Sequence, residues 1–351
     1  GRLLEPVWQQ GAMATDFWMS FPVDDRRVAE EIQTEVWLCY DDQYLFVAAR
    51  CHGSSPYVIQ SLKRDNQLFW QGDGFAIVLD PVNEQSSGFV FGTNPASVQT
   101  ESLLTGQTGR RGSQSSSGIN RAWDNKWFCQ SAEEANAWTL EMAIPFKSLR
   151  YAEKNIWGIN FIRSDAATNS YHTWSPVPVQ FRGVDLGYTG AMQWEQTPAK
   201  TPGNISLIPY TSYATSVDYE EGIPSSQSFG VGGDAKVAIT SSLNLDVTIN
   251  PDFSQVEVDE QVTNLTTVNV RFPERRLFFL ENSDVFSDFG IPPMRPFFSR
   301  RIGLDEDGNT IPIAFGARLS GNINKDLRIG AMNMHTREVN ATPGQNYTVL
   351  S

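Results

Sequence analysis

Two glutamates, Glu274 and Glu281, have the side-chain type that hydrolyses glycosides, because a pair of carboxyl groups can act as acid and base. Arg271, Arg275 and Arg276 lie beside or between them. Sequence spacing does not fix the distance between two carboxyl groups, and arginines next to glutamates usually form salt bridges. We therefore predict no catalysis by this pair.

Other catalytic patterns are missing from the sequence. The histidines, His52, His172 and His335, are scattered along the chain. It contains no nucleophile elbow, no metal-binding HExxH motif and no Walker loop. We predict a protein that is not an enzyme, with a role in glycoside hydrolysis as the less favoured alternative.

Tryptophan side chains suggest a different chemistry, the binding of sugar. A pyranose ring has an apolar C–H face, and the flat indole ring covers such a face at little entropic cost. The candidates lie outside the strand patterns, where a ring can be exposed, and packing in the core or at an edge competes with stacking for each. They are Trp174, Trp70, Trp123 and Trp127.

Trp174 is the first choice among these rings and Trp70 the second. Stacking also needs hydrogen-bonding groups nearby, and Asp73, Tyr171 and His172 are close in sequence. We predict a carbohydrate site formed by the four tryptophans with Asp73 and His172. If Trp174 and Trp70 are both more than nine-tenths buried, this prediction fails at these positions.

Calcium is the one cofactor that the sequence leaves open. Asp73 and Asp80 bracket one predicted strand, and carboxylate oxygens are ligands that calcium prefers. Capping of turns is the favoured role for both. Haem would need axial Met or His ligands aimed at one cavity, and no spacing brings such residues together.

Composition excludes several classes of function. The 351 residues carry a net charge of -13 with no basic stripe, so nucleic acid is not a predicted partner. The three cysteines form no CxxC or zinc spacing and are expected to be small buried side chains. No run of about 20 apolar residues predicts a transmembrane helix. We expect any leader peptide to have been removed before Gly1.

Tryptophan usage divides the chain into two parts. All ten tryptophans lie between Trp8 and Trp194. We predict a domain at 1–196, a linker at 197–204 and a second domain at 205–351. The first is rich in short strand patterns with turn signals between them, which favours a β-sandwich. These strands are expected at 34–40, 44–50, 73–79, 88–92, 126–132, 137–144 and 156–163, with a short helix at 145–149 and a long loop at 102–120.

The second domain has long segments in which apolar and polar residues alternate. Residues 235–250 show this period of two through a turn at Ser241-Ser242, and residues 311–323 repeat it. A second turn is expected at 324–326, and a Phe- and Arg-rich loop at 255–310 is too apolar to lie free. The predicted strands are 205–216, 229–240, 243–253, 311–323, 327–338 and 345 onward.

Long strands with alternating short and long links are typical of outer-membrane β-barrels, and a soluble antiparallel sheet is the alternative. The expected strands are too few to close a membrane barrel, so we expect more chain after Ser351. Lys236, Asn244, Asp246 and Arg318 are expected to face the lumen. The side chains expected to face lipid are Val237, Ile239, Leu243, Leu245, Val247, Ile249, Phe315, Leu319 and Ile323.

The ordered segments LLEPVW, TEVWLCYDDQYLFVAAR, GDGFAIVLDP, WTLEMAIPFKSLR, WGINFIRSD and TWSP resemble the carbohydrate-binding-module family 9-like domain. That resemblance implies a jelly-roll-like β-sandwich and, in members that bind sugar, stacking on aromatic rings with calcium nearby. The segments NPDFSQVEVDE, NLTTVNVRFPERRLFFLENSDVF and FFSRRIG resemble a family of large Gram-negative surface proteins. In that family such a domain precedes an outer-membrane barrel of unknown function.

Together these observations predict an all-β protein, with a sandwich followed by the first strands of an incomplete outer-membrane-type barrel. The expected location is the cell outer membrane, with the first domain in the periplasm. The expected partners are a glycan or oligosaccharide, membrane lipid and other envelope proteins. The expected function is glycan binding for uptake, export or attachment. A structural or docking role in the envelope, without sugar binding, is the alternative.

Overall fold

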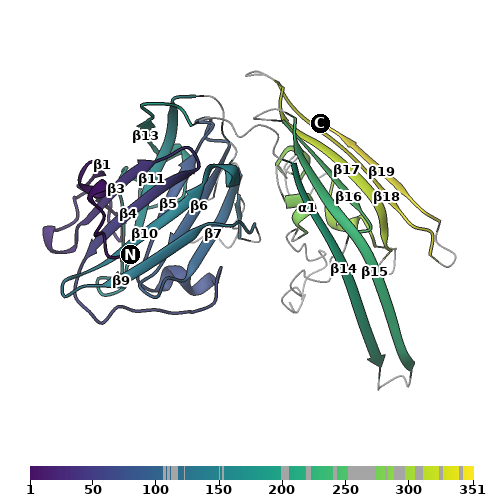
Figure 1. Cartoon of the computed structure of the whole chain (residues 1–351), viewed down its shortest axis with the longest axis horizontal. Helices are drawn as coiled ribbons and strands as arrows, with labels where there is room; N and C mark the ends of the chain where they lie inside the picture. Colours follow the sequence, from purple (N-terminus) through teal and green to yellow (C-terminus); the bar gives the residue numbers. More distant parts are fainter. Residues whose placement is uncertain are drawn as a thin grey trace. The chain divides into compact units, whose positions relative to one another are not determined.

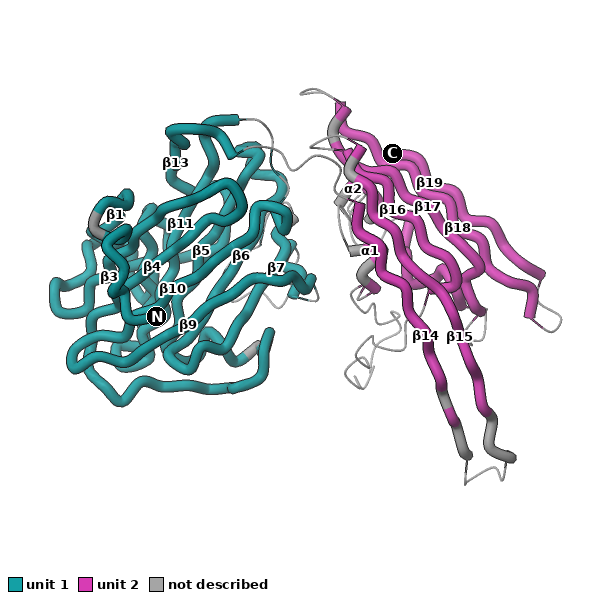
Figure 2. The backbone as a smooth tube through the Cα atoms, in the orientation of Figure 1, with its two compact units in different colours: residues 1–201 teal, residues 202–351 magenta. Residues whose placement is uncertain are grey.

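The computed structural model divides the chain into two compact units, Gly1–Thr201 and Pro202–Ser351 (Figure 2). The boundary lies inside the predicted linker 197–204, of which 199–204 are outside the described residues. The structure describes residues 1–105, 108, 111, 118–121, 123–149, 151, 154–198, 205–218, 223–239, 243–251, 274, 276–280, 284–287, 297–304, 311–323, 327–339 and 343–351.

Unit 1 contains two antiparallel sheets (Figure 1). The five-stranded sheet has the order β1 (Ala12–Ala14), β3 (Thr34–Tyr40), β4 (Tyr44–His52), β10 (Ala137–Pro145) and β9 (Phe128–Glu133). The eight-stranded sheet has the order β2 (Trp18–Phe21), β12 (Ser170–Thr173), β11 (Ile156–Asp165), β5 (Gly74–Asp80), β6 (Ser87–Thr93), β7 (Gln99–Thr105) and β8 (Ile119–Asn120), with β13 (Gly190–Gln193) also paired to β11.

A single large hydrophobic core unites the inner faces of these two sheets. Val47 and Leu140 come from the five-stranded sheet, and Ile77 and Phe161 from the eight-stranded sheet. Trp157 is fully buried in the same core, which explains why this half of the chain is rich in tryptophan. The β-sandwich expected from the sequence is therefore confirmed.

Most predicted elements of unit 1 appear close to their expected bounds. The strand at 34–40 is β3, and the predicted helix at 145–149 is only a 3-10 turn, η4 (Phe146–Ser148). The loop expected at 102–120 is shorter in the structure, because β7 continues to Thr105 and β8 begins at Ile119. Most positions between these strands lie outside the described residues. The other 3-10 turns of unit 1 are η1 (Pro6–Gln9), η2 (Glu30–Ile32), η3 (Gln67–Gln71) and η5 (Leu186–Tyr188).

Unit 2 is built on one six-stranded antiparallel sheet in which the strands follow chain order (Figure 1). Its strands are β14 (Ile205–Asp218), β15 (Ile223–Ala238), β16 (Leu243–Ile249), β17 (Ile313–Asn322), β18 (Arg328–Thr336) and β19 (Asn346–Leu350). These bounds agree with the expected strands to within two residues, except that β15 begins at Ile223 and β16 ends at Ile249. The link between β14 and β15 is therefore short where a long one is expected. The predicted turns at 241–242 and 324–326 lie outside the described residues, as do 255–273 of the predicted loop.

The two faces of this sheet differ in the way that the alternation predicts. One face carries apolar side chains such as Leu245, Val247 and Leu319, none of which is buried, and Ile249 and Phe315 on this face are exposed. The opposite face is polar at its centre and buried. There Arg318 donates to Asp246 across 2.7 Å, and Asn244, Thr248 and Ser320 are also buried. This is the reverse of a soluble sheet, which buries its apolar face.

The segment that covers the polar face comes from the predicted Phe- and Arg-rich loop. It contains α1 (Leu277–Leu280), α2 (Asp284–Ser287) and η6 (Ser299–Arg301). Phe278, Phe279 and Phe286 form a cluster with Met332 and Met334 of β18. The guanidinium of Arg276 bonds the Glu274 carboxylate at 2.7 Å and the Ser299 carbonyl at 2.6 Å, which ties the two ends of the segment together.

No helix among the described residues is long and apolar enough to cross a membrane.

Candidate functional site

Three of the six residues predicted to bind sugar are buried in the interior of unit 1. The Asp73 carboxylate is buried and accepts from the backbone N–H of Val58 at 2.7 Å and of Ala166 at 3.3 Å. His172 is fully buried, and its Nε2 lies 2.7 Å from Ser170 Oγ. A side chain without exposed area cannot touch a ligand at the surface. For Asp73 and His172, therefore, the structure replaces the predicted ligand contact with an internal role.

Trp127 is the third buried candidate. It is 3% exposed, and its indole N–H donates to Glu101 Oε2 at 3.1 Å. Burial raises the pKa of Glu101 to about 7, while donors from Arg64, Trp127 and the Asn125 backbone stabilise its charged form. This carboxyl group is fully buried, so its shifted pKa belongs to an internal network and does not indicate a binding site.

The other three candidate tryptophans, Trp174, Trp70 and Trp123, are only partly buried, so the structure leaves them open as candidates. Trp174 stands 5.9 Å from the Phe161 ring, and a Cβ added to Gly190 would lie 2.6 Å from the Trp174 ring. Trp70 packs edge-on against Phe69 at 5.1 Å. Each ring therefore has one side in contact with the protein. Trp174 joins the central core and Trp70 a separate cluster, so the two are not brought together.

Trp123 also packs against the protein. Its ring centroid lies 5.2 Å from Phe89 and 5.9 Å from Phe91, and Phe91 contacts Trp127 at 5.4 Å. Trp123 and Trp127 thus meet around one buried phenylalanine. Trp127 belongs to the core and Trp123 packs against it, so the pair does not form an open stacking surface.

The two aspartates considered for calcium cap turns. Asp80 Oδ1 accepts from the Asn83 N–H and Asp80 Oδ2 from the Gln85 N–H, both at 2.7 Å. Asp73 binds backbone N–H groups in the same way. Within the described part of the chain, no group of three or more His, Cys, Asp or Glu side chains could hold a metal ion.

His172 makes the stability of unit 1 depend on pH. Burial and the nearby Arg163 lower its pKa to about 4, whereas an unfolded histidine has a pKa of about 6.5. Between these values the unfolded chain binds a proton that the folded chain does not, so the free energy of unfolding falls as the pH falls. We expect a loss of about 1 kcal/mol from pH 6.5 to 5.5 from this residue.

Urea unfolding followed by tryptophan fluorescence at several pH values measures this loss. His172→Gln is the matched variant, because glutamine can still bond Ser170 and does not titrate. It should remove this part of the pH dependence. An identical pH slope in the variant and the parent would show that His172 does not cause it.

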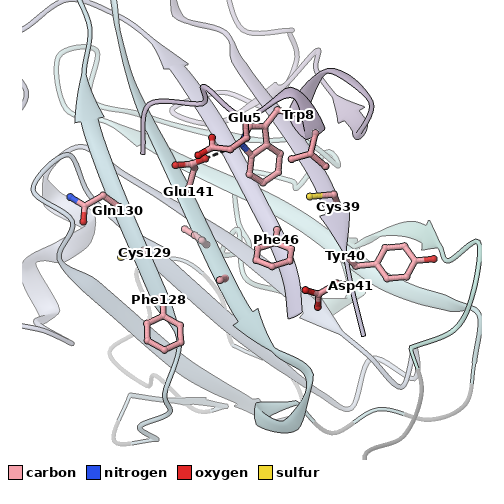
Figure 3. Close-up of a pocket in the computed structure, with 13 residues that line it drawn as sticks. Glu5, Trp8, Cys39, Tyr40, Asp41, Phe46, Phe128, Cys129, Gln130 and Glu141 are labelled. Atoms are coloured by element: carbon pink, nitrogen blue, oxygen red, sulfur yellow. Dashed lines mark hydrogen bonds between the residues drawn. The ribbon is translucent and has the colours of Figure 1, made fainter. Parts of the chain in front are cut away.

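A pocket of about 550 Å³ lies on the five-stranded sheet of unit 1 (Figure 3). It is open on one side, and four strands and the segment around η1 supply its walls. None of the six predicted site residues takes part. The lining residues are Glu5, Val7, Trp8, Cys39, Tyr40, Asp41, Phe46, Phe128, Cys129, Gln130, Glu141, Met142 and Ala143.

Strand register explains how these residues meet. Cys39 pairs with Phe46 across β3 and β4, and Gln130 pairs with Glu141 across β9 and β10. Trp8 comes from η1, and its indole N–H donates to Glu141 Oε1 at 2.8 Å. This bond holds the η1 segment against β10 and fixes the orientation of the Glu141 carboxylate.

The lining combines aromatic rings with oxygen acceptors. Phe128 of β9 is 48% exposed. Phe46 is partly exposed and comes from β4, on the other side of β10 (Figure 3). Glu5, Asp41 and Glu141 supply carboxylates, and the lining contains no Lys, Arg or His. Such a surface can accept hydroxyl donors and cover C–H groups. Beside the lining, the Lys126 ammonium lies 5.9 Å from the Phe128 ring centroid.

The sequence carries a signal for this pocket in the alternation of two strands, and the signal lies in phenylalanines rather than in tryptophans. Phe128 begins β9, whose side chains alternate between more and less exposed positions, and Phe128 falls on an exposed one. An aromatic residue on the solvent side of an alternating strand has no core to fill. The same argument applies to Phe46, which follows the buried Leu45 in β4.

One family model matches residues 201–349, and its description is "Domain of unknown function (DUF5916)". The matched range corresponds to unit 2. No curated protein matches the chain.

Several solved structures, among them the following three, resemble part of the chain. A Bacteroides uniformis protein, which its description proposes to be carbohydrate-binding, has 13% identity and a TM-score of 0.41, and the match covers 53% of this chain and 88% of that one. A carbohydrate binding module of family 9 from Caldicellulosiruptor kristjanssonii with cellotriose has 14% identity and a TM-score of 0.36, covering 55% and 87%. The same module with glucose has 13% identity and a TM-score of 0.35, covering 57% and 92%. Similarity at these TM-scores carries no argument about the ligand of this chain.

Proposed function

We propose that unit 1 binds a neutral oligosaccharide, without turnover, in the pocket on its five-stranded sheet. The observation that carries the proposal is the lining, which places exposed aromatic side chains beside carboxylate and amide oxygens and contains no basic side chain. Hydroxyl groups of a sugar donate to such oxygens, and its C–H face packs on the rings. The three carboxylates of the lining, Glu5, Asp41 and Glu141, favour a neutral ligand over a phosphorylated or acidic one, although Lys126 lies beside the Phe128 ring.

Binding without hydrolysis fits the pocket better than catalysis. A glycosidase needs one carboxyl group with a raised pKa to act as general acid. In this pocket a backbone hydrogen bond and a side-chain hydrogen bond with Glu141 lower the pKa of Glu5, so Glu5 itself does not have the raised pKa of a general acid. The Glu141 carboxylate accepts a bond from Trp8, which supports a structural role. Incubation with oligosaccharides and analysis of the reducing ends would reveal any turnover.

Replacing the exposed rings should weaken sugar binding and leave the fold intact. We expect Phe128→Ala and Phe46→Ala to lose about 1–3 kcal/mol of binding free energy each, by analogy with stacking of aromatic side chains on bases. The measurement is a glycan array followed by calorimetry with the oligosaccharide that binds best. Circular dichroism and the unfolding midpoint would show that the variants still fold.

Trp174→Ala and Trp70→Ala are the matched comparison, since they test the site predicted from the sequence. They should leave affinity unchanged if the pocket is the site. If these two variants lose affinity while Phe128→Ala and Phe46→Ala do not, the site lies at the tryptophans. If no glycan binds the parent protein, the docking role in the envelope is the better explanation of unit 1.

We propose a second role for unit 2, as part of an outer-membrane β-barrel whose apolar face contacts lipid. The specific observation is the inverted sheet, in which exposed Ile249 and Phe315 lie on one face while Arg318 and Asp246 are buried on the other. A membrane barrel has this distribution, because its outer surface meets lipid and its inner surface is polar. The segment of α1, α2 and η6 would then lie inside the barrel.

The same proposal assigns a side of the membrane to unit 1. At one end of the strands both links, β15–β16 and β17–β18, are short. At the other end the β14–β15 link is also short, but the β16–β17 link is very long, and in bacterial barrels the end with only short links faces the periplasm. β14 begins on the side of these short links. Unit 1 precedes β14 and would therefore lie in the periplasm, where it could bind a glycan for uptake, export or attachment.

A further inference from the structure

The apolar face of unit 2 has an edge that changes position from strand to strand. On β14 and β15, Tyr213 and Phe229 are paired neighbours and are 66% and 72% exposed. The next pair on this face toward the hairpin tip is Thr215 and Gln227, both exposed and polar. Along this hairpin, therefore, the apolar surface ends with a pair of aromatic rings.

Two strands further, the last apolar pair that the structure describes on this face lies at a different register. Ile249 of β16 pairs with Phe315 of β17, and both are exposed at the ends of their strands. Ile249 pairs with Gly233 of β15. Along β15, Gly233 lies four residues from Phe229, where the apolar surface of that strand ends. The Phe315 ring stacks on His335 of β18 at 5.3 Å.

On the last strands the apolar surface ends earlier still. Asn333 of β18 donates to Asn346 and Thr348 of β19, at 2.8 Å each. These side chains lie on the same face as Leu245 and Leu319, because the register pairs Leu319 with Ala331, two residues from Asn333. At the register of Asn333, therefore, β18 and β19 carry polar side chains that bond one another, whereas β14 to β17 still carry apolar side chains.

The edge runs obliquely across the sheet, and its slope can be calculated. Tyr213 lies three strands from Phe315, which is about 14 Å at roughly 4.8 Å per strand. The register difference of four residues is about 13 Å along the strand. A line through the two rings therefore makes an angle of roughly 45° with the strands. If this line lies parallel to the membrane plane, the strands tilt from the membrane normal by the complement, also roughly 45°, close to the tilt of about 35–45° found in membrane barrels.

We propose that Tyr213, Phe229 and Phe315 form an aromatic belt at one depth, at the outer boundary between lipid and water. The inference rests on the proposed membrane location of unit 2 and adds the depth and tilt of its strands. Aromatic side chains concentrate at this boundary because their rings suit both lipid and headgroups. Thr215, Gln227, Asn346 and Thr348 fall on the water side of the belt, and Val247 falls on the lipid side.

Depth measurement by spin labelling tests the belt. The whole protein, with all the strands that its barrel needs and with Cys39→Ser, Cys51→Ala and Cys129→Ser as background, is folded into phosphatidylcholine vesicles. Single nitroxide labels are attached in Tyr213→Cys, Phe315→Cys, Val247→Cys and Gln227→Cys variants, and collisions with oxygen and with a water-soluble nickel complex give each depth. The first three sites are not buried and Gln227 is exposed, so these substitutions leave no large cavity in the core.

Labels at 213 and 315 should report the same depth, with 247 deeper in the bilayer and 227 in water. Strands that stand upright would instead place 213 and 315 about 13 Å apart in depth, which would overturn the belt while leaving the membrane location intact. Equal nickel accessibility at all four sites, including 247, would refute the membrane location itself and the belt with it.

Discussion

Replacing Arg163 with methionine should lower the free energy of unfolding of unit 1 by about 3–5 kcal/mol, because it leaves a buried charge and several buried acceptors without a partner. Arg163 is 1% exposed. One terminal nitrogen, Nη1, donates to the Ile32 carbonyl at 2.8 Å, and the other, Nη2, donates to the His52 carbonyl at 2.6 Å and to Asp165 at 3.2 Å.

The size of this effect follows from what methionine cannot replace. It has a similar length and can fill much of the space, but it donates no hydrogen bond. The Asp165 carboxylate, at 4% exposure, would lose its guanidinium partner, and the carbonyls of Ile32 and His52 would lose their donor. Removing one partner of a buried pair is more destabilising than never having the pair, since the remaining charge stays desolvated.

Tryptophan fluorescence measures this effect selectively, because all ten tryptophans belong to unit 1 and unit 2 has none. Lys154→Met is the matched control, since Lys154 pairs with Glu84 at 3.1 Å on the surface and should contribute at most about 1 kcal/mol. A urea midpoint that moves equally in both variants would mean that the Arg163 network does not hold the sandwich together.

Local patterns were sufficient to predict the strands but not the positions of single side chains relative to a surface. The period of two predicted β16 and β17 and the composition of both faces, because alternation depends only on neighbouring residues. Asp73 follows a polar stretch and precedes a strand, which is equally compatible with an exposed ligand and a buried acceptor. Its donors, Val58 and Ala166, come from distant loops that no local pattern connects.

The assembly of the pocket could not be predicted for the same reason, although alternation alone could mark Phe46 and Phe128 as rings on the solvent side of their strands. Trp8, Phe46 and Phe128 belong to three separate segments, and only strand order and register bring them to one face. Choosing site residues by type favoured tryptophan, although most tryptophans here fill the core. Trp127 illustrates this, since it lies in a polar stretch of sequence yet is buried with its N–H bonded to Glu101.

Replacing Val247 with arginine should hinder insertion of unit 2 into lipid by about 2–4 kcal/mol, the effect of arginine on a lipid-facing strand near the middle of the bilayer. Val247 is central among the apolar side chains of β16, between Leu245 and Ile249. Its register neighbours are Ala235 and Ala317, which offer no carboxylate to pair with a guanidinium.

Gln227→Arg is the control, because it adds the same side chain to the same sheet face outside the apolar surface. Near the interface the effect of arginine is about 0–1 kcal/mol, so this variant should insert like the parent. Insertion is measured by urea titration in phosphatidylcholine vesicles, with the fraction of folded protein read from its gel mobility without heating. If unit 2 were a water-soluble sheet, both arginines would be tolerated and neither variant would differ from the parent. A penalty confined to Val247→Arg would support lipid as the neighbour of this face, because water or a polar partner would not discriminate between the two positions.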